Sequence, residues 1–496
     1  MLVLLLCINA YRAWQQSIVH DEAFTYHVYL AGPSATIFEY YTANLHFLFV
    51  ILAKLSVTLF GVSAFAMRLP TLVAGALYFA VAYRLSLFLF EGSAGFLLSV
   101  LVLTLNPLVL DFLVAARGYG LALALLLQAL CDLLAYLSAG NGTATVSSRN
   151  VVLYRAGGAL ALSVTANLAF LIPAIAMSLL FVGALLNEDR NARAGAGLLK
   201  PLARLHAGLG QYALPMAYIA LVFFLVSPVR NATKADLYAG SSSLVESIRL
   251  LIDLSFAHKY ARSLANNGTA VFGWWSRLRF FVLLPPLLLL ATAMLAFVSR
   301  KVWRGGKPRT RAELALYIAM GTIVVSVLAL VAGHYVLGLP YPTDRTGLYL
   351  LPLFTLASLA SMKILKTKTG PVRWLAPGVA VVLAISVVIY AGELNTNYFA
   401  MWMYDADTRD IVRTIAAREA NGTRAVRLGL SWVLEPSVNY YRTILKQDRI
   451  QPADRSGPDH DSDYFVLVSE DHSLLESRHL KTLQKFATSG VILAVP

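Results

Sequence analysis

Long apolar runs separated by short polar segments occupy most of the chain up to residue 392. The runs cover residues 1–14, 67–88, 94–110, 119–137, 151–186, 209–227, 279–299, 313–333, 346–362 and 374–392. Run 151–186 is long enough for two helices that turn near Asn167. About 20 helical residues cross a bilayer core, and only structures that satisfy their own backbone hydrogen bonds persist in lipid. The pattern therefore predicts a polytopic α-helical membrane protein with about 11 spans.

Basic residues in three polar segments give the expected orientation. Segments 190–204, 300–311 and 363–373 are rich in Lys and Arg, so the positive-inside rule makes all three cytoplasmic. Alternation then puts loops 19–66 and 228–278 outside.

Residues 45–61 would form a helix of roughly 25 Å, too short to cross, with Lys54 in its middle. We predict a juxtamembrane or re-entrant helix there. The alternative is that it crosses and that Asp21 faces the cytoplasm.

Two further segments depart from the pattern of spans. Within loop 228–278, residues 244–257 carry apolar side chains at helical spacing, which predicts an interfacial helix. After residue 403, charged residues return at ordinary density. Helices are expected at 407–420, 434–445 and 472–486, and strands at 424–430, 464–468 and 491–495. This alternation predicts a small parallel α/β domain. We expect a membrane domain over 1–392 and an extracytoplasmic domain over 393–496.

Composition supports this division and excludes other classes. The chain is 58% hydrophobic and 14% charged, whereas soluble proteins carry about 25% charged residues. The net charge of +14 gathers in short loops, so topology explains it and no nucleic-acid partner is expected. Cys7 and Cys131 both lie in apolar runs and indicate neither a disulfide nor a metal site. No metal-ligating residue is predicted, and the sequence leaves open whether the protein uses a divalent metal.

Polar and ionisable residues from separate segments share the outer face in this topology. They are Asp21, Glu22, Asn44, His46, Asp111, Arg117, Asn167, Tyr341, Asp344 and Arg345, and Lys259 follows the expected interfacial helix in loop 228–278. Such groups at membrane depth indicate a functional site. A carboxylate takes a hydroxyl proton as general base, and forked guanidinium groups suit phosphate. The set predicts transfer from a lipid-phosphate donor.

Each residue has an assigned role in this hypothesis and a simpler alternative. Asp21 or Glu22 is the base, and Arg117, Arg345 and Tyr341 bind the donor phosphate. The remaining substrate contacts are His46, Asn44, Asp111 and Lys259. Alternatively, the acidic pair is ordinary loop solvation, the arginines anchor lipid headgroups, and Asp111 simply pairs with Arg117.

Several short motifs follow one another in a distinctive order along the membrane part of the chain. They are His20-Asp21-Glu22, Leu59-Phe60-Gly61, Phe65-Ala66-Met67-Arg68-Leu69-Pro70, Asn106-Pro107 and Ala116-Arg117-Gly118-Tyr119. This order resembles the GT-C superfamily of integral-membrane glycosyltransferases, and the nearest branch comprises bacterial relatives of protein O-mannosyltransferases and of the lipid A aminoarabinose transferase. Where many relatives have His-Pro-Pro-Leu, this chain has His46-Phe47-Leu48-Phe49.

The resemblance implies an activity and a location. Asp21 corresponds to the catalytic base with Glu22 beside it, Arg117 to the donor-phosphate residue, and Arg345 more weakly to the same phosphate. The donor would be a sugar on polyprenyl phosphate, and the transfer hexosyl or pentosyl. The acceptor would be a hydroxyl of a lipid, glycan or protein outside the cytoplasmic (inner) membrane. The rival hypothesis is a lipid or sugar transporter or flippase, which would predict inverted repeats; we find no clear repeat.

Overall fold

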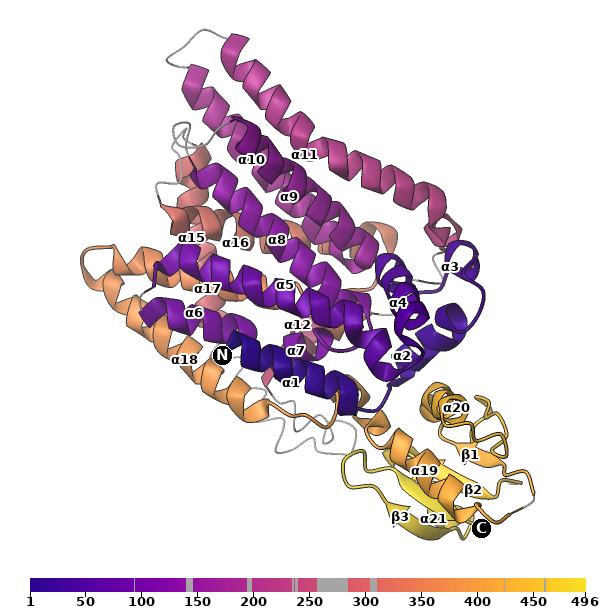
Figure 1. The fold of residues 1–496 in the computed structure, drawn as a ribbon. Coiled ribbons are helices and arrows are strands. Elements are labelled where there is room, and N and C mark those ends of the chain that lie inside the picture. The colour runs from indigo at the N-terminus through magenta and orange to yellow at the C-terminus, as the bar shows by residue number, and fades with distance from the viewer. Residues whose placement is uncertain are drawn as a thin grey trace.

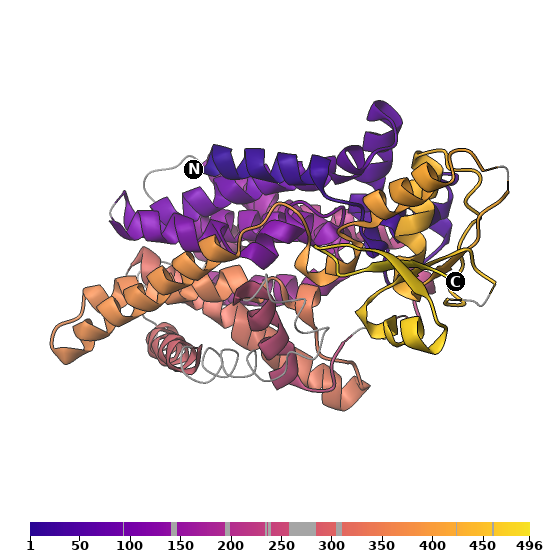
Figure 2. The same ribbon diagram turned by 90° about the horizontal axis from the view of Figure 1, so that it is seen from below.

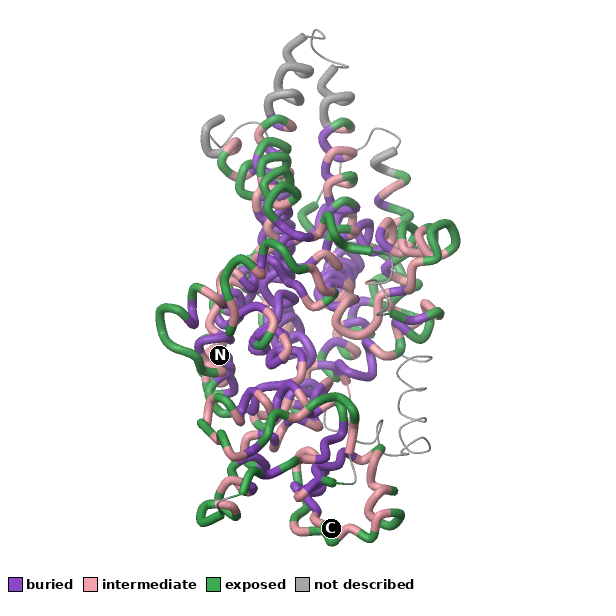
Figure 3. The backbone as a smooth tube through the Cα atoms, turned by 90° about the vertical axis from the view of Figure 1, so that its right-hand side faces the viewer, coloured by how far each residue is buried: buried purple, intermediate pink, exposed green. Residues whose placement is uncertain are grey.

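The computed structural model describes the whole chain except residues 93, 140–145, 194–198, 234–235, 237–239, 257–283, 304–309, 423 and 459–460. Long helices form one bundle, and a small sheet domain lies at one end of it (Figures 1 and 2). Buried residues run through the middle of the bundle (Figure 3).

The expected helices are present in the order that the sequence predicts. Their bounds are α1 (Leu2–Gln15), α2 (His20–Thr25), η1 (Tyr26–Leu30), α3 (Thr36–Glu39), α4 (Phe47–Phe60), α5 (Ala64–Phe90), α6 (Ala94–Thr104), α7 (Pro107–Phe112), α8 (Gly118–Ser138), α9 (Val146–Ala166), η2 (Leu168–Phe170), α10 (Leu171–Arg193), α11 (Leu199–Val226), η3 (Pro228–Asn231), α12 (Leu244–Phe256), α15 (Leu284–Trp303), α16 (Arg311–Leu337), η7 (Asp344–Gly347), α17 (Leu350–Lys366), η8 (Pro371–Trp374) and α18 (Leu375–Glu393).

Within the described residues, seven helices are long and apolar enough to cross a membrane. They are formed by α5, α8, α10, α11, α16, α17 and α18, in three cases with a few preceding residues. The chain is therefore a multi-pass membrane protein. The other expected spans correspond to α1, α6, α9 and α15, so the total of about 11 stays a prediction.

Two local features explain how the bundle departs from uninterrupted spans. The run expected over 94–110 ends as a helix at Thr104, because Pro107 begins the separate helix α7 and the Asn106 side chain caps it by accepting from the Val109 amide at 3.1 Å. Helix α4 has 14 residues, about 21 Å, which agrees with a non-crossing helix. Lys54 donates to the carbonyls of Leu30 and Gly32 at 2.7 and 2.8 Å, so its charge meets the end of η1.

The C-terminal region forms a four-stranded sheet with flanking helices. Its elements are η9 (Ala400–Asp405), α19 (Thr408–Arg418), β1 (Leu428–Leu430), η10 (Trp432–Leu434), α20 (Glu435–Ile444), β2 (Tyr464–Leu467), η11 (Ser469–Asp471), α21 (Ser473–Ser477), β3 (Lys481–Lys485) and β4 (Ile492–Val495). The strand order is β1-β2-β4-β3.

The prediction of a purely parallel sheet is wrong. Strands β1 and β2 are parallel, but β2–β4 and β3–β4 are antiparallel. The helix expected over 472–486 is wrong as well, because only α21 is helical there and β3 pairs with β4. Gly490 has a φ of +76° in the connection between them, which glycine adopts without cost. Lysines at both ends of β3 suit an exposed edge strand.

The C-terminal domain packs onto the first loop of the bundle, beside α1 and α2 (Figures 1 and 2). The Ile18 amide donates to the Tyr441 hydroxyl at 2.7 Å, and the His20 ring bonds the Val433 carbonyl at 2.6 Å. The His20 amide donates to the Asp405 carboxylate at 2.6 Å. These bonds hold α2 and the residues before it against the C-terminal region, about 400 positions later in the sequence.

Candidate active site

Asp21 lies near the start of α2 between two arginines that come from distant segments. Its Oδ2 is 3.1 Å from a terminal nitrogen of Arg345, in η7, and 3.7 Å from one of Arg117, which precedes α8. Burial by itself would raise the pKa of Asp21, but the charges of Arg345 and Arg117 outweigh it and lower that pKa. The carboxylate is therefore ionised.

Glu22 makes an entirely different set of contacts. Its two oxygens accept from Arg68 at 2.9 and 2.6 Å, and both side chains are fully buried. One oxygen also accepts from the Ala116 amide at 2.6 Å. Because Ala116 precedes Arg117 and Glu22 follows Asp21, the hydrogen bond from the Ala116 amide to Glu22 joins the segments that carry Asp21 and Arg117. The two neighbouring carboxylates, between which the sequence left the choice of base open, therefore have different partners.

Arg117 is held by polar groups on the segment between α1 and α4. It donates to the Asn44 side-chain oxygen at 2.9 Å and to the Thr25 hydroxyl at 3.1 Å. It also approaches the Asp21 carbonyl at 3.3 Å. Asn44, which the sequence proposed as a substrate contact, thus orients the guanidinium.

His46 is buried directly against the start of α8. Its ring packs edge-on to Tyr119 with ring centroids 4.9 Å apart. Gly118 permits this approach, because a Cβ there would lie 2.7 Å from the Cβ of His46 and 2.1 Å from the Ala166 carbonyl oxygen. Glycine at this position therefore allows His46 and the end of α9 to pack closely against the start of α8.

Five polar residues of this site form a buried group whose charges act on one another. We call Asp21, Asn44, His46, Arg117 and Arg345 the Asp21 cluster. Burial, Arg117 and Arg345 together hold the pKa of His46 well below its usual value, so its ring is neutral. Within the described residues, three buried atoms of the cluster have no hydrogen-bond partner: Asp21 Oδ2, His46 Nε2 and Arg117 Nε. Native structures leave few buried polar atoms unsatisfied.

Sequence reasoning missed two aromatic residues at this site. The Arg345 guanidinium lies 5.6 Å from the centre of the Trp402 ring, within cation–π range. Tyr119 lies edge-on to the His46 ring, with the ring centroids 4.9 Å apart. Tyr119 belongs to the motif that carries the family resemblance, which could have identified it. Trp402 follows the last span in the sequence, and no local signal connects it to the first loop.

Asp111, a predicted substrate contact, has structural partners instead. Its ion-pair partner is Arg12, rather than Arg117, and both side chains are buried. It also accepts from the Ala400 amide at 2.9 Å. Asp111 therefore joins α1 and α7 to the segment that leads into the C-terminal domain.

The last two predicted residues are Tyr341 and Lys259. Tyr341, expected at the donor phosphate, forms a backbone bridge with Ser241, and its ring stacks on His334 at 4.4 Å. These contacts give Tyr341 a packing role between η7 and the segment before α12. Lys259 lies outside the described residues. Among the residues that the structure describes, no group of His, Cys, Asp and Glu side chains could hold a metal ion.

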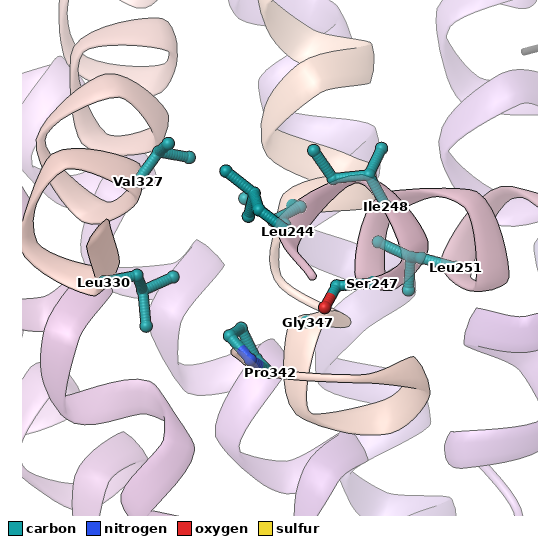
Figure 4. A pocket seen from close by; sticks show the side chains of 9 residues that line it. Leu244, Ser247, Ile248, Leu251, Val327, Leu330, Pro342 and Gly347 are labelled. Atoms are coloured by element: carbon teal, nitrogen blue, oxygen red, sulfur yellow. The ribbon is translucent and has the colours of Figure 1, made fainter. Parts of the chain in front are cut away.

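An apolar pocket opens beside the segment that carries Arg345 (Figure 4). It lies between α12 and α16, and Gly347, two residues after Arg345, is in its wall. Its lining residues are Leu244, Ser247, Ile248, Leu251, Val327, Leu330, Pro342, Gly347 and Leu350.

The fold can now be compared with known proteins. No protein-family model and no curated protein sequence matches this chain. Among solved structures, ArnT from Cupriavidus metallidurans in the apo state is similar over 99% of this chain and 96% of that chain, with 14% identity and a TM-score of 0.51.

Weaker likenesses involve two further structures. ArnT from Cupriavidus metallidurans bound to undecaprenyl phosphate gives a TM-score of 0.48 with 13% identity, over 99% of this chain and 97% of that one. The Archaeoglobus fulgidus oligosaccharyltransferase in complex with Zn and sulfate gives 0.46 with 13% identity, over 92% and 62%. The likeness to apo ArnT shows the fold. The chain therefore has the same type of fold as ArnT, which agrees with the fold that the resemblance predicted.

Proposed function

We propose that this chain is a membrane glycosyltransferase that moves one sugar from a polyprenyl-phosphate donor to a hydroxyl acceptor. The observation that carries the proposal is the buried carboxylate of Asp21 between Arg345 and Arg117. Three buried atoms of this cluster, Asp21 Oδ2, His46 Nε2 and Arg117 Nε, have no hydrogen-bond partner among the described residues, so they are available to hydrogen-bond a ligand.

The charges of the cluster suit a phosphate. Two guanidinium groups face the single carboxylate of Asp21, so the arginines outnumber the carboxylate that pairs with their side chains. Arg117 also precedes the first turn of α8, where the helix dipole favours an anion. Phosphate oxygens would satisfy the free Arg117 Nε, because arginine donates in a forked, planar geometry.

The reaction follows from these charges. The Asp21 carboxylate accepts the proton of the acceptor hydroxyl, and that oxygen forms a bond to the anomeric carbon. The bond between the anomeric carbon and the phosphate oxygen breaks, and its electron pair stays on the phosphate. Arg117 and Arg345 stabilise the new negative charge. Without phosphate, both arginines lower the pKa of Asp21; sharing them with phosphate raises it and makes Asp21 a better base.

The domain division and orientation remain part of the proposal. Residues 1–392 form the catalytic membrane domain with outer loops 19–66 and 228–278, and residues 393–496 form a domain outside the cytoplasmic membrane. The three basic segments support this orientation. The contact between Trp402 and Arg345 supports it further, because the C-terminal domain then lies on the same face as the Asp21 cluster.

The test is transfer from labelled polyprenyl-phosphate sugars in membranes that contain the full chain. Asp21→Asn should lower the rate by at least about 100-fold, the usual contribution of a general base. Asp410→Asn is the matched control, because Asp410 is exposed and its partner Arg413 is 3.7 Å away; it should leave the rate unchanged.

Two outcomes would contradict the proposal. Full activity of Asp21→Asn would remove Asp21 as the base. Movement of intact lipid-linked sugar between leaflets, without any transfer by the wild-type chain, would favour the flippase hypothesis instead. Cells that lack the chain should accumulate the carrier-linked sugar, which identifies the donor.

A further inference from the structure

Asp132, on α8, is a fully buried carboxylate that holds two arginines from the neighbouring helices α5 and α9 (Figure 1). Its two oxygens accept from Arg155 at 2.7 and 2.6 Å, and one of them also accepts from Gln128 at 2.7 Å. Arg84 approaches the same carboxylate at 3.4 Å. Arg155 already contacts both oxygens, so Arg84 is a second cation on a carboxylate that has its counter-ion. We call these four residues the Asp132 group.

The Asp132 group lies at membrane depth, toward the face opposite the Asp21 cluster. Asp132 is about 21 Å along α8 from Gly118, where that cluster adjoins the helix, and about 9 Å from Ser138 at the other end. Arg84 is about 9 Å from the end of α5. Both helices are long and apolar enough to cross a membrane. In the proposed orientation, the group therefore lies in the cytoplasmic half of the bilayer.

The two arginines face outward, although the carboxylate between them is buried. The side chains of Arg84 and Arg155 are 42% and 50% exposed, whereas that of Asp132 is 0% exposed. Leu87 is exposed one turn after Arg84 on α5, and Val151 is exposed one turn before Arg155 on α9. Exposed apolar side chains on spanning helices face lipid. Both guanidinium groups are therefore presented to the bilayer, where ionisable groups indicate a functional site.

The charges at this end of the three helices do not balance. Helices α5, α8 and α9 contain one carboxylate, Asp132, and Glu91, directly after α5, pairs with an arginine of α16 at 2.7 Å. Arg84 and Arg155 thus share a single carboxylate. Arg149, near the start of α9, adds a further basic residue. Within the described part of the chain, Arg84 Nε and Arg155 Nη1 have no hydrogen-bond partner.

We propose that Arg84 and Arg155 bind the phosphate of an anionic phospholipid in the leaflet that borders them. Guanidinium groups donate to phosphate in a forked geometry, and Asp132 fixes the position of both. Exposed apolar residues beside the arginines suit the acyl chains. An anionic headgroup supplies the charge that these helices lack, whereas a zwitterionic headgroup carries its own cation. The site is separate from the Asp21 cluster and does not depend on the proposed sugar transfer.

Binding of defined lipids to the purified full chain in detergent, followed by native mass spectrometry, tests the proposal. The probes are dioleoyl phosphatidylglycerol, which is anionic, and dioleoyl phosphatidylcholine, which has the same acyl chains and no net charge. One arginine near anionic lipid contributes about fivefold in affinity. The wild type should therefore bind one phosphatidylglycerol at least about fivefold more tightly than phosphatidylcholine.

Two variants locate the site. Arg84→Gln should weaken binding of phosphatidylglycerol by about fivefold and leave binding of phosphatidylcholine unchanged. It leaves Arg155 on both oxygens of Asp132, so it should fold, and its melting temperature without lipid should match the wild type. Arg373→Gln is the matched control, because Arg373 is exposed on another basic segment of the same face. It should bind both lipids as the wild type does.

Three results would overturn the proposal. Equal affinity of the wild type for the two lipids would do so without any variant. Equal losses in Arg84→Gln and Arg373→Gln would show only a general attraction of the basic face for anionic lipid. Displacement of phosphatidylglycerol by an equal concentration of inorganic phosphate would assign the arginines to a soluble anion instead. Sugar transfer is not measured in any of these experiments, so failure of the proposed function would leave this test intact.

Discussion

Replacement of Glu22 by glutamine should destabilise the protein rather than remove its base. The carboxylate accepts four hydrogen bonds, two from Arg68 and one each from the backbone amides of Ala116 and Val19. Glutamine keeps the size of the side chain but removes the charge and one acceptor. The Arg68 guanidinium, which is fully buried, would then lack its counter-ion.

The expected magnitude follows from the burial of the pair. Breaking a fully buried ion pair on one side costs about 3–5 kcal/mol, because an uncompensated charge remains. Unfolding entropy grows with chain length, so each kcal/mol shifts the melting temperature of a chain of this size by about 1–2 °C. We therefore expect a fall of about 3–10 °C in the apparent melting temperature.

The assay is thermal unfolding of the full chain in detergent, followed by tryptophan fluorescence. Glu91→Gln is the matched control, because Glu91 pairs with Arg311 at 2.7 Å on the surface and both side chains are more than half exposed. Exposed pairs contribute little, so its melting temperature should not change. If Glu22→Gln keeps the wild-type melting temperature yet abolishes transfer, Glu22 acts in the chemistry and our assignment of Asp21 is wrong.

Three further predictions follow from the same contacts. Arg345→Lys should raise the KM for a polyprenyl-phosphate sugar more than tenfold, because the forked geometry is lost; an unchanged KM would exclude Arg345 from the phosphate site. Gly118→Ala should reduce expression or activity severely, since its Cβ would lie 2.1 Å from the Ala166 carbonyl oxygen; a fully active variant would contradict that packing. Burial raises the pKa of Asp405 to about 7, despite hydrogen bonds that lower it. The folded state therefore holds a proton that the unfolded state releases, so the contribution of Asp405 to stability should fall as pH rises from about 4 to 7. Asp405→Asn should flatten the dependence of melting temperature on pH over that range, and an unaltered slope would assign the titration to another group.

The local pattern of the sequence predicted most of the membrane domain. Apolar runs identified the long helices, the turn near Asn167 divided α9 from α10, and the short run 45–61 corresponds to the 14-residue helix α4. These features depend on residues near one another, because helix length and capping are set within a few turns. The C-terminal sheet was harder, since β3 is an edge strand whose pairing with β4 decides its conformation.

The site was predicted only in part. Asp21, Arg117 and Arg345 were expected on one face, and the structure brings them within 4 Å. The partners of Asp111 and the contribution of Trp402 were not predicted, because both depend on the segment after α18 folding back onto the bundle. Contacts between residues hundreds of positions apart leave no periodic signal in a single sequence.

The sequence by itself determined that this is a multi-pass helical protein with an acidic pair after its first helix. Only the tertiary structure decided that Asp21 faces Arg117 and Arg345 while Glu22 faces Arg68. Successive residues on a helix point about 100° apart. Two neighbouring carboxylates on α2 therefore meet different partners, and those partners come from helices that only the packed bundle brings together.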